Sequence, residues 1–292
     1  MEINRNELDD YFLDYMMFPR YINNIGNVYP IKLSNYNRFK YLASKYLLQG
    51  KTYLINIYKM PKDINVLDFL VTNAFRIQQL EMLSMYKAQT EEEKIYLNKI
   101  KNKLEEYNKN QYTKFSIYEI EELFQLILHK EVKFKPVIEN DTLIKYSFEG
   151  NGIKIDRNNF DIIRKHTMEQ NLLYEPITSP SKFINEMIEK AIAVHNKECG
   201  DNSGDLCAII SVVKSEFKLS DEEIFNYTIY RLRFDYYIVS KKISNTYIFM
   251  LRSQGNDVPI AELSEKVNLN INPYDFILNK NNGTHTLDEK LK

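Results

Sequence analysis

Apolar side chains recur at steps of three and four residues along most of this chain, the spacing that places them on one face of an α-helix. Phe39, Leu42 and Tyr46 show the pattern clearly. The helices it predicts cover residues 34–50, 64–83, 91–107, 117–128, 157–172, 181–192, 206–213 and 221–243. Most of the chain is therefore expected to be helical.

Between two of these helices the period changes from that of a helix to that of a strand. Apolar and polar residues alternate over 132–134 and 142–148. The sequence Gly150-Asn151-Gly152 follows and favours a tight turn before residues 153–155. We expect a small antiparallel hairpin or three-stranded meander near residues 131–155.

Two shorter segments carry weaker signals. Val28–Leu33 is expected to form a short strand at a sheet edge, because Pro30 lacks the N–H that an inner strand needs. Tyr53–Tyr58 alternates and fits either a strand or a continued helix, and both alternatives stay open.

Three short motifs mark helix starts. A hydroxyl residue stands three positions before a glutamate at Thr90/Glu93, Ser116/Glu119 and Ser220/Glu223. In such a capping box, each side chain accepts a hydrogen bond from the other residue's free backbone N–H. We expect all three pairs to close the first turn of their helices.

The predicted fold class is mainly α, with helical bundles and the small antiparallel meander near residues 131–155. A length of 292 residues fits two domains. We expect residues 1–130 to form a helical N-terminal part, and residues 131–278 to combine the β hairpin with a helical C-terminal part. Residues 279–292 contain no aromatic side chain and are expected to form a flexible tail.

Charge and composition narrow the functional classes. The chain has 39 basic and 40 acidic residues, and this balance disfavours general nucleic-acid binding, which needs a basic excess. No run approaches the ~20 apolar residues of a membrane helix. The N-terminus also lacks the basic and apolar segments of a signal peptide. We expect a cytoplasmic protein with neither membrane nor nucleic acid as its leading partner.

Reactive residue types are sparse and scattered. His195, Cys199 and Cys207 lie close together in sequence, but zinc sites usually draw four ligands from paired motifs. The four histidines have no local catalytic motif around them. We therefore expect no metal, no cofactor and no catalytic residue, and a function other than catalysis.

The most informative segment is the predicted helix from Asp221 to about Ile243. One face carries an apolar stripe, and a second face carries the aromatic residues Tyr227, Tyr230, Phe234 and Tyr237. Either the helix lies centrally in a bundle with both faces buried, or part of the aromatic face is exposed. Tyrosine and phenylalanine are enriched at protein interfaces, so an exposed face would bind a partner.

These four aromatic residues are the first candidate partner-binding set. A second candidate set lies near the N-terminus, where Tyr11, Phe12 and Tyr15 follow an acidic segment. If exposed, such rings would cover apolar helical segments of a client protein or form contacts within a homo-oligomer.

Three segments resemble proteins encoded in the tail-gene modules of phages and prophages of Firmicutes, some of which are treated as tail assembly chaperones. The segments are Tyr29–Leu33 with the helix after it, Ile155–Ile163 continuing through Met168–Leu173, and Ser220–Tyr237. The resemblance implies a non-enzymatic protein. It would bind the long tape-measure protein, or another tail component, before the tail tube closes around it.

Two alternatives to this chaperone-like role stay open. The chain would be a structural subunit of the virion, in the tail or connector, if its aromatic faces form permanent contacts. It would be a nucleic-acid-binding regulator if it uses the helix near residues 90–110, where Lys99, Lys101 and Lys103 are interleaved with glutamates.

Overall fold

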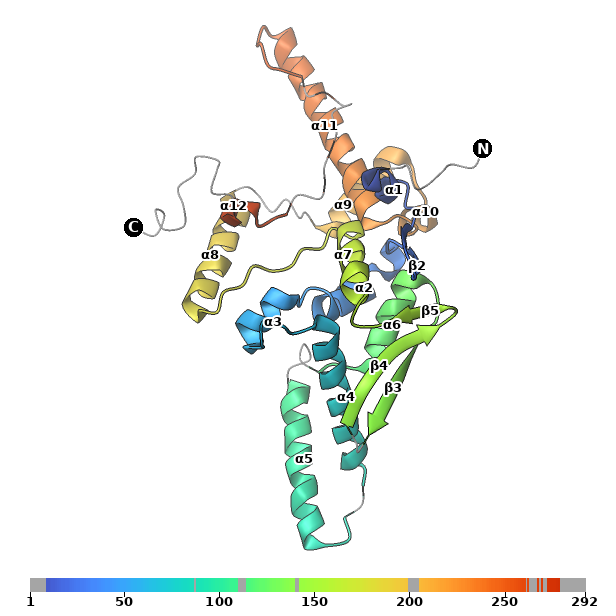
Figure 1. Ribbon diagram of the computed structural model, residues 1–292. Helices are drawn as coiled ribbons and strands as arrows, with labels where there is room; N and C mark the ends of the chain where they lie inside the picture. The colour runs from blue at the N-terminus through green and yellow to red at the C-terminus, as the bar shows by residue number, and fades with distance from the viewer. Residues whose placement is uncertain are drawn as a thin grey trace. The chain divides into compact units, whose positions relative to one another are not determined.

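The computed structural model describes residues 9–86, 88–109, 114–139, 142–198, 205–260, 262, 267, 269 and 272–278. Over these residues the chain is mainly helical with two small sheets, which confirms the predicted fold class (Figure 1). None of the helices in the described ranges combines the length and the apolar character that a bilayer crossing requires. The predicted tail, 279–292, lies outside the described residues.

The described helices are α1 (Asp10–Tyr15), α2 (Leu33–Tyr46), α3 (Lys51–Tyr58), α4 (Val66–Ser84), α5 (Glu91–Lys109), α6 (Ile117–Leu128), α7 (Phe160–Gln170), α8 (Lys182–Glu198), α9 (Leu206–Phe217), α10 (Asp221–Phe225), α11 (Ile229–Ser253) and α12 (Asp275–Leu278). The strands are β1 (Arg20–Ile22), β2 (Gly26–Val28), β3 (Lys133–Glu139), β4 (Thr142–Gly150) and β5 (Ile153–Ile155). β1 pairs with β2, and β3, β4 and β5 form a second sheet in that order.

The chain divides into two compact units, each drawn from separated stretches of sequence. The first unit contains Met1–Arg20, Pro30–Asn37 and Met168–Lys292, and the second contains Tyr21–Tyr29 and Arg38–Thr167. The boundary expected at residue 130 therefore falls inside the second unit, between α6 and β3. The reason is that β4 packs on α6, where the rings of Phe148 and Phe124 lie 5.1 Å apart.

The three-stranded sheet forms where the alternating pattern predicted it. β3 pairs antiparallel with β4, and β4 pairs antiparallel with β5, with Gly150 opposite Ile153. The two residues between this last pair, Asn151 and Gly152, have φ angles of 51° and 75°. Positive φ at both positions is the backbone of a tight type I′ turn, which explains why asparagine and glycine occupy them.

Aromatic rings join the elements of the second unit into a core. Phe124 of α6 lies 6.1 Å from Phe160 at the start of α7. Phe115, just before α6, lies 5.9 Å from Tyr46 of α2 and 5.8 Å from Phe69 of α4. Each such pair contributes about 0.5–1.5 kcal/mol beyond the burial of its surface, so these rings hold helices that are distant in sequence.

The first unit is built around α9, α10 and α11. Ile209 and Val213 of α9 pack with Ile229 and Leu232 of α11 in one buried cluster, which Leu33 at the start of α2 completes. Burying one aliphatic side chain of this size contributes about 1.5–3 kcal/mol. This cluster therefore fixes α9 against the first half of α11.

Two of the three predicted capping boxes are present. The Glu93 backbone N–H donates to the Thr90 hydroxyl at 3.2 Å, and the Thr90 N–H donates to the Glu93 carboxylate at 3.2 Å. Ser220 and Glu223 close the start of α10 in the same reciprocal way. Local sequence alone was sufficient to find these two helix starts.

The single helix predicted over 221–243 is wrong, because two helices, α10 and α11, meet at residues 226–228. Thr228 caps α11, its side chain accepting from the Arg231 backbone N–H at 3.2 Å. Thr228 also forms a β-bridge with Lys32, and the Leu33 N–H donates to the Tyr227 carbonyl at 2.8 Å. The chain that leads into α2 therefore stabilises the break between α10 and α11. The local sequence pattern does not specify this pairing.

The structure also decides the two segments whose sequence signals were weak. Tyr53–Tyr58 is helical and belongs to α3, which settles the open alternative. The strand predicted at Val28–Leu33 is wrong over most of its length, because β2 ends at Val28 and α2 begins at Leu33. Between them, the Ile31 N–H donates to the side chain of Asn171 at 3.1 Å.

Gly150, at the end of β4, leaves no room for a side chain. A Cβ added there would lie 2.3 Å from the backbone carbonyl oxygen of Glu131. We expect Gly150→Ala to lower the free energy of unfolding by about 1–3 kcal/mol, measured by urea denaturation. Lys135→Ala, at an exposed position of the same sheet, should change it by less than about 0.5 kcal/mol. Equal effects of the two substitutions would contradict this close packing.

Candidate functional site

The two sets of aromatic residues predicted to bind partners meet in the first unit, where α1 lies against the first half of α11 (Figure 1). The rings of Tyr15 and Phe234 lie 4.7 Å apart. The Arg231 guanidinium lies 3.9 Å from the centre of the Tyr15 ring and 5.4 Å from that of Tyr227. We call Tyr15, Tyr227, Arg231 and Phe234 the aromatic seam, and it joins two parts of one chain.

The predicted contact residues differ in exposure. Tyr230 is only 1% exposed and is a core side chain. Phe12 is exposed, and the remaining predicted residues, Tyr11, Tyr15, Tyr227, Phe234 and Tyr237, are partly buried. The alternative in which both faces of the helix are covered therefore describes this half of α11, and Tyr230 is not available to a partner.

Buried ion pairs accompany the aromatic seam. The Arg231 Nε donates to Asp235 Oδ2 at 2.9 Å, and Asp235 is buried. After α1, Arg20 donates to both carboxylate oxygens of the buried Asp14, at 2.6 and 3.2 Å, and to Glu169 at 2.7 Å. Breaking a buried pair by removing one partner costs about 3–5 kcal/mol. These pairs therefore oppose rearrangement around α1 and the seam.

The second half of α11 lacks this cover. Its apolar stripe continues, at steps of three or four residues, from the buried Leu232 and Val239 to Ile243, Tyr247 and Met250. These last three side chains are 49%, 64% and 56% exposed, and we call them the distal stripe. One face of a single helix thus passes from core to surface beyond Val239.

The opposite side of this half of α11 is occupied by the chain that follows the helix. The Lys241 ammonium donates to the Glu262 carbonyl at 3.0 Å, and the Arg252 Nε donates to the Val258 carbonyl at 2.7 Å. Asn245 lies between Lys241 and Arg252 on the same side and is buried. The returning chain therefore covers the polar side and leaves the distal stripe exposed.

The distal stripe was missing from the predicted site. The predicted helix ended near Ile243, so the residues beyond it were not weighed as a surface. The spacing of Ile243, Tyr247 and Met250 continues the helical period of the buried stripe, and this signal could have identified them.

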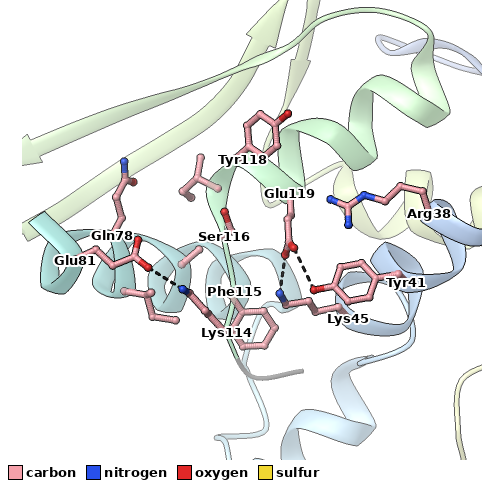
Figure 2. A pocket seen from close by; sticks show the side chains of 13 residues that line it. Arg38, Tyr41, Lys45, Gln78, Glu81, Lys114, Phe115, Ser116, Tyr118 and Glu119 are labelled. Atoms are coloured by element: carbon pink, nitrogen blue, oxygen red, sulfur yellow. Dashed lines mark hydrogen bonds and ion pairs between the residues drawn. The ribbon is translucent and has the colours of Figure 1, made fainter. Parts of the chain in front are cut away.

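The second unit holds a cleft of about 550 Å³ lined by residues of α2, α4 and the segment leading into α6 (Figure 2). Each of its three basic side chains forms an ion pair: Arg38–Glu122, Lys45–Glu119 and Lys114–Glu81, with N–O distances of 2.5, 2.6 and 2.9 Å. The cleft therefore presents neutralised pairs along its described lining, with Ala74 and Ile77 among its apolar residues.

Glu119 is the centre of the polar contacts in this cleft. Its carboxylate accepts hydrogen bonds from Lys45 at 2.6 Å, from the Tyr46 hydroxyl at 2.5 Å and from the Tyr41 hydroxyl at 3.2 Å. Burial alone would raise the pKa of Glu119, but the hydrogen bonds from Lys45 and Tyr46 outweigh burial and hold that pKa below its usual 4.5. Burial, and next the bond to Glu119, raise the pKa of the Tyr46 hydroxyl, which therefore stays protonated.

The capping box predicted at Ser116 and Glu119 is wrong, and the same cluster explains why. The Ser116 side chain makes no capping hydrogen bond, since Lys45 and Tyr46 of α2 bind the Glu119 carboxylate. The Ser116 N–H donates instead to the Tyr46 hydroxyl at 3.0 Å. A tertiary contact has replaced the local cap.

The residues with metal-ligand chemistry lie in other surroundings. His195 stacks on Phe276 of α12 with ring centres 3.9 Å apart. Cys207 is exposed, and Cys199 lies outside the described residues. In the part of the chain that the structure describes, no group of three or more His, Cys, Asp or Glu side chains could hold a metal ion.

We expect Glu119→Gln to lower the free energy of unfolding by about 3 kcal/mol, because it leaves the buried Lys45 ammonium without a charged partner. Glu122→Gln is the matched control. Its ion pair with Arg38 is exposed, and such pairs contribute about 0–1 kcal/mol. Urea denaturation followed by circular dichroism measures both. Equally small losses would show that Glu119 is not the centre of a buried network.

The lowered pKa of Glu119 predicts a pH dependence. A carboxyl whose folded-state pKa lies below its unfolded value stabilises the fold above the unfolded value, 4.5, and loses this effect as the pH falls through the folded-state pKa. The difference in unfolding free energy between the wild type and Glu119→Gln should therefore shrink as the pH is lowered from about 6 to about 3. A constant difference would contradict the assignment.

Comparison with protein families, with curated proteins and with solved structures finds no match to this chain.

Proposed function

We propose that this chain is a non-enzymatic assembly protein that binds an apolar helical segment of a partner protein on the distal stripe of α11. The observation that carries the proposal is one continuous apolar face, buried as far as Val239 and exposed at Ile243, Tyr247 and Met250. Fully burying an apolar side chain of this size contributes about 1.5–3 kcal/mol. A row of three such side chains therefore provides a strong driving force for association.

The packing of α9 indicates which kind of partner fits this face. Ile209 and Val213 of α9 are four residues apart and pack with Ile229 and Leu232 of α11. A partner helix with apolar residues at the same spacing would continue this packing along the distal stripe. Tyr247, the most exposed of the three, is the expected anchor, because tyrosines often dominate the binding energy of interfaces.

The resemblance of Tyr29–Leu33, Ile155–Leu173 and Ser220–Tyr237 to phage tail-module proteins indicates which partner to test first. That partner is a phage tape-measure protein, or else another tail component. Apolar helical segments of such a client would need a cover until assembly buries them elsewhere. The distal stripe would supply that cover, and the aromatic seam would keep α11 in place.

We expect Ile243→Asp combined with Tyr247→Asp to weaken binding of the tape-measure protein by at least about 30-fold, the effect of losing roughly 2 kcal/mol at an interface anchor. Isothermal titration calorimetry with the purified full chain measures the affinity. Because both side chains are exposed, circular dichroism should be unchanged by the two substitutions.

Tyr21→Asp is the matched control. Tyr21 lies on β1 and is 64% exposed, as is Tyr247, so the same substitution there changes surface charge without touching α11. Wild-type affinity is expected for this control. Undiminished binding by the α11 double variant, or an equal loss in Tyr21→Asp, would contradict the proposal.

A further inference from the structure

Helix α5 carries a surface in the second unit that the proposed function does not use. One side of α5 is buried against α4 through Leu97, Ile100 and Leu104, and the two helices lie side by side in Figure 1. On the outward side, Ile95 and Tyr96 are each 58% exposed. Two large apolar side chains thus stand next to each other in the middle of an exposed helix face.

Charge changes sign along this outward face. Glu92 lies about one turn before Ile95 and Tyr96, and Lys99 lies about one turn after them, on the same side of the helix. Both charged side chains are exposed, and neither forms an ion pair within the described residues. Along the helix, this face is therefore acidic at Glu92, apolar at Ile95 and Tyr96, and basic at Lys99.

We propose that α5 docks on α5 of a second copy of this chain, antiparallel, about a two-fold axis that passes between Ile95 and Tyr96. In this register Ile95 packs on Tyr96 of the second copy, and Glu92 faces Lys99 of the second copy. The two-fold axis repeats each contact, as in most homodimers. The two apolar side chains then meet their counterparts, and Glu92 and Lys99 each meet an opposite charge.

The order of charges selects both the occupant and the direction. A parallel pair of α5 helices would set Glu92 against Glu92 and Lys99 against Lys99, and like charges in direct opposition are unfavourable. In the antiparallel arrangement, opposite charges face each other and the apolar side chains of the two copies also meet. The contact also leaves the packing of α5 on α4 intact, because Leu97, Ile100 and Leu104 lie on the other side.

One helix face per copy is small beside the roughly 800 Å² per partner of a standard interface, so a weak dimer is expected. Sedimentation velocity of the full chain over a range of micromolar concentrations measures its dissociation constant. Glu92→Lys and Lys99→Glu each create two like-charge contacts across the axis, and each is expected to raise the dissociation constant at least about tenfold. Combining them restores both pairs with the signs exchanged, so the double variant should return to within about threefold of the wild type.

Lys101→Glu is the matched control, because Lys101 is exposed on a different side of α5, and it should leave the dissociation constant unchanged. Circular dichroism confirms that each variant keeps its helix content. A wild-type chain that stays monomeric at every concentration would overturn the proposal. A double variant as weak as the single variants would overturn it as well. These substitutions leave the distal stripe intact, so this result is independent of partner binding by α11.

Discussion

The first unit depends on an apolar stripe along α11 that is longer than the cover its own chain provides. In the first half of the helix, α9 buries Leu232 on one side, and α1 covers the aromatic seam on another. Beyond Val239 the same face continues without cover through Ile243 to Met250. The buried half of the stripe stabilises the unit, and the exposed half is the surface to which the proposed function assigns a partner. Contact between these apolar side chains and water is unfavourable, and burial against a protein partner would remove it.

The polar interactions of both units serve a different purpose from the apolar ones. The buried Arg20 and Lys45 form ion pairs with residues of other elements, and Lys45 with Glu119 is the clearest example. A buried pair adds less stability than apolar side chains of equal volume, but its geometry specifies how two helices meet. The cleft in the second unit carries little net charge for the same reason, because each of its basic side chains is paired with a glutamate. The exposed apolar faces, rather than this cleft, therefore carry the proposals for function.

Sequence periodicity was sufficient to predict the mainly helical fold and the small sheet, because both depend on local spacing. It failed where a distant residue decides the outcome. Lys45 takes the Glu119 carboxylate from the predicted cap, and the chain near Leu33 pins the break before α11. Tyr230, Phe234 and Tyr237 do lie on one helix, but Tyr227 lies in the break before it, and the pattern could not reveal that α1 packs on this helix. A periodic face identifies what needs burial, and only the tertiary structure shows what buries it.

The central claim is that the apolar face of α11 is covered in its first half and open in its second half while the chain is free. Hydroxyl-radical footprinting with mass spectrometry reads this directly, because oxidation of tyrosine and methionine follows their exposure to water. The account predicts rapid oxidation of Tyr247 and Met250 and strong protection of Tyr230 in the free chain, with the first two becoming protected when the tape-measure protein is added. Equal protection of Tyr247 and Tyr230 in the free chain would contradict it.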